Sequence, residues 1–577
     1  MINPNSANLQ QRATHTVSVT IKIGGKDVTA NPGGYISASI HRELNKIPTA
    51  RLFFADGAVE QQDFPKSNTN DFTPGKEVEI LAGYSQQQET IFKGIIVRHA
   101  IQARTGRPSV LELECKDPAI KMALVRKSTY HYNQSDDGIL QQIIQGYSDL
   151  SVGTIQSTPV QHPELVQFHC TDWDFMLLRA DANGLAVNVL DAQVNLKKPE
   201  VAAQAQLQVQ YGQGSAGVSL LEFEADIDTR MHYPGVKAYN WDYTQQPPQP
   251  GGQETRLAAE SAGNTGAAAG ASGVGQVASA AGAPGTAQRD FPQLLYGQNP
   301  INLYHGGDLD TQELKVWAEA KFKRSELSHV RGRVRVLGLE AIPGDTIELN
   351  GVGDRFNGKH LISGVMHQIH NGTWQTDIQF GWQAAFTSEN LDVQVPDAAG
   401  LTGAIQGLQI GIISKVGGDT ESGNHRVQVR LPYVANNTNG TQADGIWARL
   451  ATLHAGNDRG FVFRPDVGDE VIVGFLNNDP NDAIVLGSLH SNNNAAPSAF
   501  PANDDNFKKG FVSKTGLTLS FDDDEQAKLI SISGGASGPK IELDAANNKI
   551  TIALDASNSI ELSTQGVKIK GTRIDLN

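Results

Sequence analysis

The sequence is poor in cysteine and contains no long apolar run. Its two cysteines, Cys115 and Cys170, cannot form a disulfide framework, and we expect both to be buried thiols in a reduced compartment. No stretch of about 18 apolar residues occurs, so no membrane-spanning helix is predicted. Residues 1–11 are polar and lack the apolar core of a secretory signal. The formal net charge of -15 argues against phosphate-backbone binding as the main function.

Charge is also scarce, at 19% of the residues, whereas 59 residues are glycine. An ordinary globular protein has about a quarter of its residues charged. The composition therefore indicates many turns and small residues. The length of 577 residues corresponds to about three to five domains. Domains of that size bury sizeable cores without disulfide or metal cross-links.

Alternating apolar residues predict that most of the chain forms strands. Clear examples of the period of two that a half-buried strand requires are 16–23, 76–81, 90–97 and 330–337. Three helices are expected among these strands. Ser135 can cap the first, and Thr171 or Asp172 can start the second. Asp310 and Glu313 form a predicted capping pair for the third.

The segment 251–290 differs from its surroundings. It contains 9 Gly and 12 Ala among 40 residues and no aromatic residue. Such a composition buries too little apolar surface to offset the entropy of ordering. We predict a flexible insertion that interrupts a domain, because strand patterns resume at 330–337.

A second change in composition near residue 396 separates two regions. Several short strands before residue 490 suit a small Greek-key barrel of the OB type. We therefore expect a β-barrel region at 1–395, an OB-fold domain at 396–490 and a polar linker at 491–507.

The last region, 508–577, repeats an apolar–polar–apolar triplet every 7 to 11 residues. One chain offers only two inward side chains per triplet, so we predict an intertwined homotrimeric β-helix. A monomeric parallel β-helix is the alternative. The residues expected in the trimer core are Ile530, Ile532, Ile541, Leu543, Ile550, Ile552, Ile560, Leu562, Val567 and Ile569. Ile574 and Leu576 would lie exposed at a blunt end, which predicts contact with a tip protein.

Several blocks of sequence resemble VgrG-type spike proteins and the spikes of contractile phage tails. The most specific block is 465–480 followed by 483–490, which resembles the OB fold of that family. Upstream, 171–179 and 332–338 resemble its hub. The order of these blocks along the chain is that of the family: hub, OB barrel and β-helix.

The resemblance implies a mainly β protein with two hub β-barrel domains and a few helices, an OB barrel and a trimeric β-helix. Such a hub joins a six-fold inner tube to a three-fold spike that pierces a target envelope. Expected partners are an inner tube protein, baseplate proteins and a PAAR-repeat tip protein. Only about 20 residues separate barrel and β-helix, and no effector domain follows. The chain therefore looks closest to spikes of antifeeding-prophage and Photorhabdus virulence-cassette type.

That subtype implies synthesis in the bacterial cytoplasm and assembly into a phage tail-like particle that is released, with the target membrane contacted only during penetration. A type VI secretion spike that carries effectors is the alternative. An enzyme or glycan-binding tail protein is a third interpretation.

Motifs for catalysis, cofactors or metals are weak, so we expect none of these functions. His367 and His370 have ligand-like spacing, but on a strand their side chains point to opposite faces. The acidic run 522–525 could hold calcium, but a solvated turn is the favoured interpretation. In the OB region, intersubunit contacts are favoured over nucleic-acid binding for Arg426, Arg430, Arg449, Arg459, Arg464, Trp447, Phe461 and Phe463.

Overall fold

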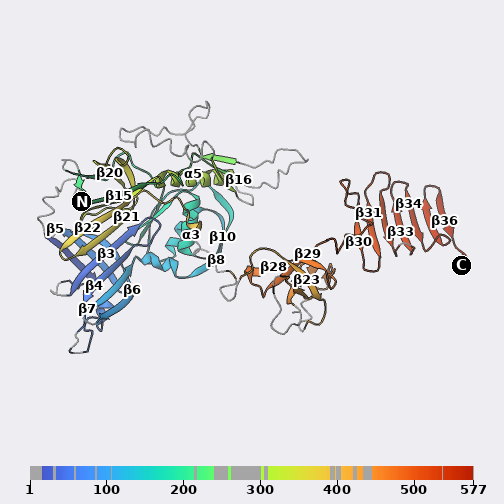
Figure 1. Cartoon of the computed structure of the whole chain (residues 1–577), viewed down its shortest axis with the longest axis horizontal. Coiled ribbons are helices and arrows are strands. Elements are labelled where there is room, and N and C mark those ends of the chain that lie inside the picture. Colours follow the sequence, from blue (N-terminus) through green and yellow to red (C-terminus); the bar gives the residue numbers. More distant parts are fainter. Residues whose placement is uncertain are drawn as a thin grey trace, which may run out of the picture. The chain divides into compact units, whose positions relative to one another are not determined.

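The computed structural model (Figure 1) describes residues 16–575, with gaps at 30–33, 58–59, 61, 85–86, 105–106, 213–216, 240–257, 262–299, 305–309, 390–396, 398–403, 420–424, 433, 435–444 and 536. The chain divides into two compact units, Met1–Val395 and Pro396–Asn577. Within the described residues the protein is mainly β, as the sequence predicts.

The first unit is organised around one 14-stranded sheet. Its first half consists of β1 (Val17–Ile23), β2 (Lys26–Asp27), β3 (Tyr35–Glu43), β4 (Thr49–Ala55), β5 (Glu77–Tyr84), β6 (Gln87–Arg104) and β7 (Arg107–Lys116). Burial alternates along these strands, so that Ala50, Leu52 and Phe54 of β4 face a core that Phe72 of η3 (Asn70–Phe72) also joins. The period of two in the sequence thus becomes one buried face.

The second half of the sheet encloses a separate core. It consists of β13 (Leu207–Gln210), β14 (Val218–Ser219), β15 (Glu222–Ile227), β19 (Val330–Leu337), β20 (Thr346–Asn350), β21 (Gly358–His370) and β22 (Thr373–Phe380). The antiparallel pairing of β21 with β3 joins the two halves.

Helices and short strands make up the rest of the first unit. Between β7 and β13 lie η4 (Pro118–Ala123), β8 (Arg126–Ser135), α2 (Asp136–Gln145), β9 (Ser151–Ile155), β10 (Gln161–Thr171), α3 (Asp172–Ala182), β11 (Ala186–Leu190) and β12 (Gln193–Lys197). Later come β16 (Val236–Tyr239), β17 (Ala258–Ser261), β18 (Ile301–Tyr304), α5 (Thr311–Ser328) and η7 (Thr387–Glu389).

The helix starts follow local capping chemistry. Thr171 Oγ1 accepts a hydrogen bond from the amide of Asp174 at 3.0 Å, and this bond begins α3. Asp310 caps α5 through the amide of Gln312. Two details of the sequence prediction were wrong. Ser135 occupies the N-cap position of α2 without a side-chain capping bond, and Glu313 pairs with Arg179 instead of completing a capping box.

Most of the predicted flexible insertion 251–290 lies outside the described residues. Residues 258–261 are described and form β17, which pairs antiparallel with β16. The prediction was therefore wrong for these four residues, because backbone hydrogen bonds to a neighbouring strand do not require large side chains.

The second unit begins with a closed five-stranded barrel in the order β23–β24–β25–β29–β28. Its elements are β23 (Gln409–Lys415), β24 (Val427–Arg430), β25 (Ile446–Leu450), β28 (Glu470–Phe475), η11 (Leu476–Asn478) and β29 (Ala483–Ser488). A separate hairpin joins β26 (Ala455–Gly456) to β27 (Arg459–Gly460). Val427, Val429, Val471 and Val473 fill the barrel core.

After the barrel, seven strands of five residues each form an antiparallel meander, here called the blade. They are β30 (Lys508–Val512), β31 (Thr518–Asp522), β32 (Leu529–Ser533), β33 (Lys540–Asp544), β34 (Lys549–Ala553), β35 (Ser559–Ser563) and β36 (Gly566–Lys570), coloured orange to red in Figure 1. Because every neighbouring pair is antiparallel, the alternative of a monomeric parallel β-helix is wrong.

Candidate functional site: an apolar sheet face

The blade brings its apolar residues together on one face. The middle residue of each triplet points to the other side, because successive side chains of a strand alternate. In β32, for example, Ile530 and Ile532 share a face while Ser531 lies on the opposite one. The triplets of the sequence therefore become a sheet with one apolar and one polar face.

The register aligns these residues in two ladders across the strands. One ladder runs through Phe511, Leu519, Ile532, Ile541, Ile552, Ile560 and Ile569. The other runs through Phe521, Ile530, Leu543, Ile550, Leu562 and Val567. These thirteen residues are called the apolar face. The ten residues that the sequence analysis assigned to a trimer core all lie on it.

Three members of the apolar face were missing from the predicted core. Phe511, Leu519 and Phe521 belong to the first two strands, where the spacing of the triplets is less regular. The spacing of two residues between Leu519 and Phe521 was the signal that could have identified this pair, because side chains two positions apart on a strand share a face.

The apolar face is solvent-exposed in the single chain. Ile532 is 50% exposed and Ile569 54%, whereas the aliphatic residues of the OB barrel core are nearly fully buried. A contiguous patch of this kind on a soluble protein marks an interaction surface.

Short polar turns fix the register that aligns the ladders. Between β33 and β34, Asp544 Oδ1 accepts hydrogen bonds from the amide of Asn547 at 2.9 Å and from its side chain at 3.2 Å. Asp555 and Asn558 repeat this arrangement between β34 and β35. Because a slip of one residue would move every apolar side chain to the polar face, these turns preserve the surface.

The two predicted tip residues follow β36. Ile574 is 51% exposed. Leu576 lies outside the described residues, so the structure does not describe this predicted pair together.

A buried ion-pair network holds the helical part of the first unit. Asp136 on α2 is 1% exposed and receives two bonds from Arg179 of α3, Nε to Oδ1 at 2.5 Å and Nη2 to Oδ2 at 2.9 Å. His162 and Asn183 also contact its Oδ2. Burial alone would raise the pKa of Asp136, but these hydrogen bonds and the Arg179 charge hold it well below its usual value.

The last described segment of the first unit, Trp382–Glu389, is fastened to α5. The Arg324 guanidinium lies 4.2 Å from the centre of the Trp382 ring and forms a 2.6 Å ion pair with buried Asp181. Lys321 Nζ contacts Glu389 Oε1 at 2.6 Å. This segment therefore resists separation from the unit through ion pairs and aromatic packing.

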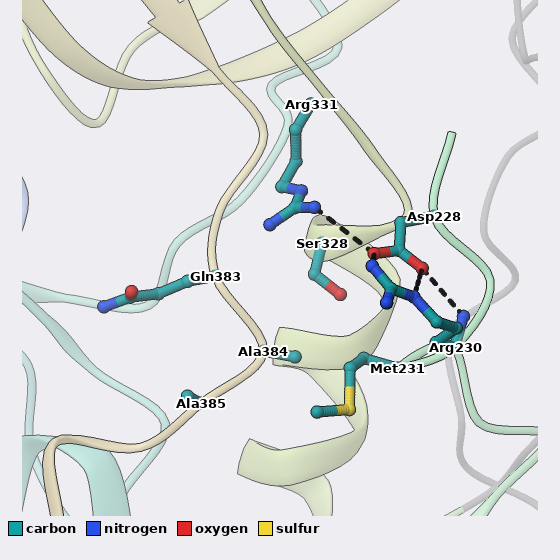
Figure 2. Close-up of a pocket in the computed structure, with 8 residues that line it drawn as sticks. All are labelled: Asp228, Arg230, Met231, Ser328, Arg331, Gln383, Ala384 and Ala385. Atoms are coloured by element: carbon teal, nitrogen blue, oxygen red, sulfur yellow. Dashed lines mark hydrogen bonds and ion pairs between the residues drawn. The ribbon is translucent and has the colours of Figure 1, made fainter. Parts of the chain in front are cut away.

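A cavity of about 450 Å³ lies beside this segment (Figure 2). Arg230 forms a two-point ion pair with Asp228, with Nη2 at 2.8 Å from Oδ2, and this contact lowers the pKa of Asp228 to about 2. Arg331 contacts the same carboxylate at 3.5 Å and Asp226 at 3.3 Å. Both arginines are thus paired with carboxylates, and we assign the cavity no chemistry.

Other candidate residues are separated by the fold. On β21, His367 is fully buried and His370 is exposed, as expected for strand positions three residues apart. Burial, followed by the Arg42 charge, lowers the pKa of His367 to about 3. Among the residues that the structure describes, no group of three or more His, Cys, Asp and Glu side chains is placed to hold a metal ion. Cys115 and Cys170 are buried free thiols, as predicted.

Two arginines expected between subunits are bound within the chain. Arg426 forms a two-point ion pair with Asp419, at 2.9 and 2.7 Å. Arg464 donates to the carbonyl of Val416 at 3.2 Å. These intrachain contacts form because loop carboxylates and carbonyls of the same barrel lie within reach, and the intersubunit role of the two residues stays a prediction. Phe461 and Phe463 remain exposed.

Two models of known protein families match this chain. Residues 409–490, which contain the closed barrel, match the family described as the type VI secretion system/phage-baseplate injector OB domain. Residues 13–371 match the family described as the Alg8 N-terminal domain, and the chain belongs to this family. The sequence resemblance to VgrG-type spikes is confirmed.

Among curated proteins, the type VI secretion system spike protein VgrG1a of Pseudomonas aeruginosa is 24% identical over 235 residues, which is 39% of this chain and 36% of that protein. The spike protein VgrG3 of Vibrio cholerae is 38% identical over 76 residues, 13% of this chain and 7% of that protein. The chain thus spans about a third or less of these relatives.

Among solved structures, a 43 kDa prophage MuSo2 tail protein from Shewanella oneidensis aligns with a TM-score of 0.44 and 10% identity, over 64% of this chain and 100% of that one. The E. coli c3393 protein, described as a component of the type VI secretion system, aligns with a TM-score of 0.40 and 10% identity, over 81% of this chain and 99% of that one. No helix in the described part of the chain is long and apolar enough to cross a membrane.

Proposed function

We propose that the protein is the hub and spike of a contractile injection particle and acts as a homotrimer. The observation that carries this proposal is the apolar face of the blade, which extends over seven strands and is left exposed by the described residues. The match of 409–490 to the injector OB domain supports the same role. The trimer core then consists of the ten predicted residues together with Phe511, Leu519 and Phe521.

Three copies suit this surface better than two. Each sheet presents only two side chains per strand, so a two-sheet sandwich would leave both ladders at its open sides. Three sheets around one axis place six apolar side chains at each level, and the turns lie at the three corners. Such a prism is narrow and stiff, which suits penetration of an envelope.

The first unit supplies the hub in this proposal. The segment Trp382–Glu389 precedes the second unit along the chain, and its contacts with Arg324 and Lys321 would pass force on that segment to the first unit. An inner tube protein and baseplate proteins would bind the hub, and a tip protein of the PAAR-repeat type would cover the end that carries Ile574 and Leu576. The target membrane is then met only during penetration.

We infer an extracellular, phage tail-like particle as the setting, with no enzymatic activity, cofactor or nucleic acid involved. A spike of a type VI secretion system is the second candidate, and the names of the curated relatives favour it. Purification with associated proteins separates the two: sheath and tube proteins in a released particle favour the first, and membrane-complex proteins favour the second.

The test of the spike role is the mass and shape of the purified full chain. We expect light scattering to give three times the chain mass of 61.9 kDa, and electron microscopy to show a three-fold particle with one narrow end. A stable species of one or two chains at micromolar concentration would contradict the proposal.

A further inference from the structure

The β26–β27 hairpin of the OB barrel is ordered without a core of its own. All residues from 451 to 464 are exposed, among them Leu453 at 89% and Val462 at 76%. The hairpin pairs only Ala455 with Gly460 and Gly456 with Arg459. Two-stranded hairpins of this size are marginal in water unless another surface covers them.

One exposed side chain of this hairpin, that of Phe463, continues the apolar face of the blade. The Phe463 ring stacks on the Phe511 ring, with centroids 5.5 Å apart and an interplanar angle of 15°. Phe511 lies on the first strand of the blade and pairs with Leu519, so it begins one of the two apolar ladders. Phe463 therefore extends that ladder beyond the sheet and into the barrel domain.

Polar contacts hold the hairpin in this position. Lys514, in the turn between β30 and β31, contacts Asp466 at 3.1 Å. Two residues earlier, Arg464 is bonded to the carbonyl of Val416. Thr452 donates to the carbonyl of Phe461 at 2.9 Å. Within the described residues, a hairpin that carries the large apolar side chains of Leu453, Phe461, Val462 and Phe463 is thus ordered next to the first strand of the blade and left uncovered.

We propose that a second copy of this chain covers the hairpin, so that residues 451–464 form a collar that extends the trimer interface from the blade to the OB barrel. This inference rests on the proposed homotrimer. The occupant follows from continuity: whatever packs against the ladder that begins at Phe511 also reaches Phe463, and in the proposed trimer that is the neighbouring copy.

Hydrogen–deuterium exchange on the full-length trimer tests the collar. We expect the amides of the hairpin that are bonded within it, such as Phe461, to exchange at least about 100-fold slower than in a free hairpin, since opening then requires local separation of the subunits. The double variant Leu453→Ser/Val462→Ser removes apolar surface that makes no core contact in the single chain. It should abolish this protection and raise the chain concentration at half dissociation at least about 10-fold.

Leu476→Ser is the matched control, because Leu476 is 53% exposed on a different loop of the same barrel. It should leave both measurements unchanged. A particle of three chains whose hairpin exchanges at the free rate, or a double variant that behaves like the control, would overturn the collar and leave the spike role intact. A wild-type mass of a single chain would overturn the spike role itself.

Discussion

Substitution of Ile550 by aspartate tests the central claim that the apolar face is the core of a trimer. Ile550 lies in the middle of a ladder, between Leu543 and Leu562, and is 40% exposed in the single chain. Complete burial of such a side chain contributes about 1.5–3 kcal/mol. Because about 40% of the side chain is still exposed, its burial on assembly contributes about 1 kcal/mol. Over the ten predicted core residues this amounts to about 10 kcal/mol of assembly free energy per chain.

The aspartate removes this gain and adds the cost of burying a carboxylate, several kcal/mol even after partial relaxation. We take about 4 kcal/mol per chain, and the three-fold axis places three such groups at one level, so the loss is about 12 kcal/mol per trimer. This loss raises the chain concentration at half assembly by about 10⁴-fold.

The assay is molar mass by light scattering over a dilution series, together with thermal unfolding. The Ile550→Asp variant should dissociate at concentrations where the wild type remains trimeric, and it should unfold at a lower temperature. Ser520→Asp is the control. It introduces the same charge on the polar face, where Ser520 pairs with Gly510 and Ser531. If the two variants showed the same mass and the same unfolding temperature, the prism would be refuted.

Three further predictions concern the first unit. Asp136→Asn leaves the Arg179 charge buried without its anion and should lower the free energy of unfolding by about 3 kcal/mol, measured by chemical denaturation. His367 has a folded pKa of about 3, below its usual value of about 6.5, so it stabilises the fold above pH 6.5 and this contribution is lost as the pH falls toward 3. His367→Gln should therefore reduce the proton uptake on unfolding at pH 5 by about one proton, and an unchanged slope of stability against pH would contradict the burial argument. Gly338→Ala would place a Cβ 2.0 Å from the Trp374 ring and should destabilise the unit. Gly25→Ala meets open space and adds only the backbone strain of a φ of +80°, so it should cost less when both are compared by thermal unfolding.

Periodicity identified ten of the thirteen residues of the apolar face, but not the partners that other residues contact. The ten predicted core residues all lie on one face, because a period of two is a local property that any extended strand expresses. The same reasoning separated His367 from His370. Capping was less predictable: Thr171 and Asp310 cap their helices, but Ser135 does not, since a capping bond also depends on the approach of the chain to the helix.

Long-range partners could not be predicted from spacing. Glu313 meets Arg179 across 134 positions, and Arg324 meets Asp181 across 143. These contacts exist because α3 and α5 pack together, and nothing local in either segment encodes that. The stacking of Phe463 on Phe511 likewise depends on how the barrel and the first strand of the blade fold beside each other.

The sequence by itself determined that the chain is mainly β, that it ends in repeated apolar triplets and that its relatives are spike proteins. Composition, period and ordered motifs are properties of the linear chain, so they need no coordinates. Only the tertiary structure decided that the triplets form an antiparallel meander with two continuous ladders, and that the OB hairpin extends one of them. Register and inter-element packing depend on hydrogen bonds and contacts between distant residues, which a one-dimensional pattern does not specify.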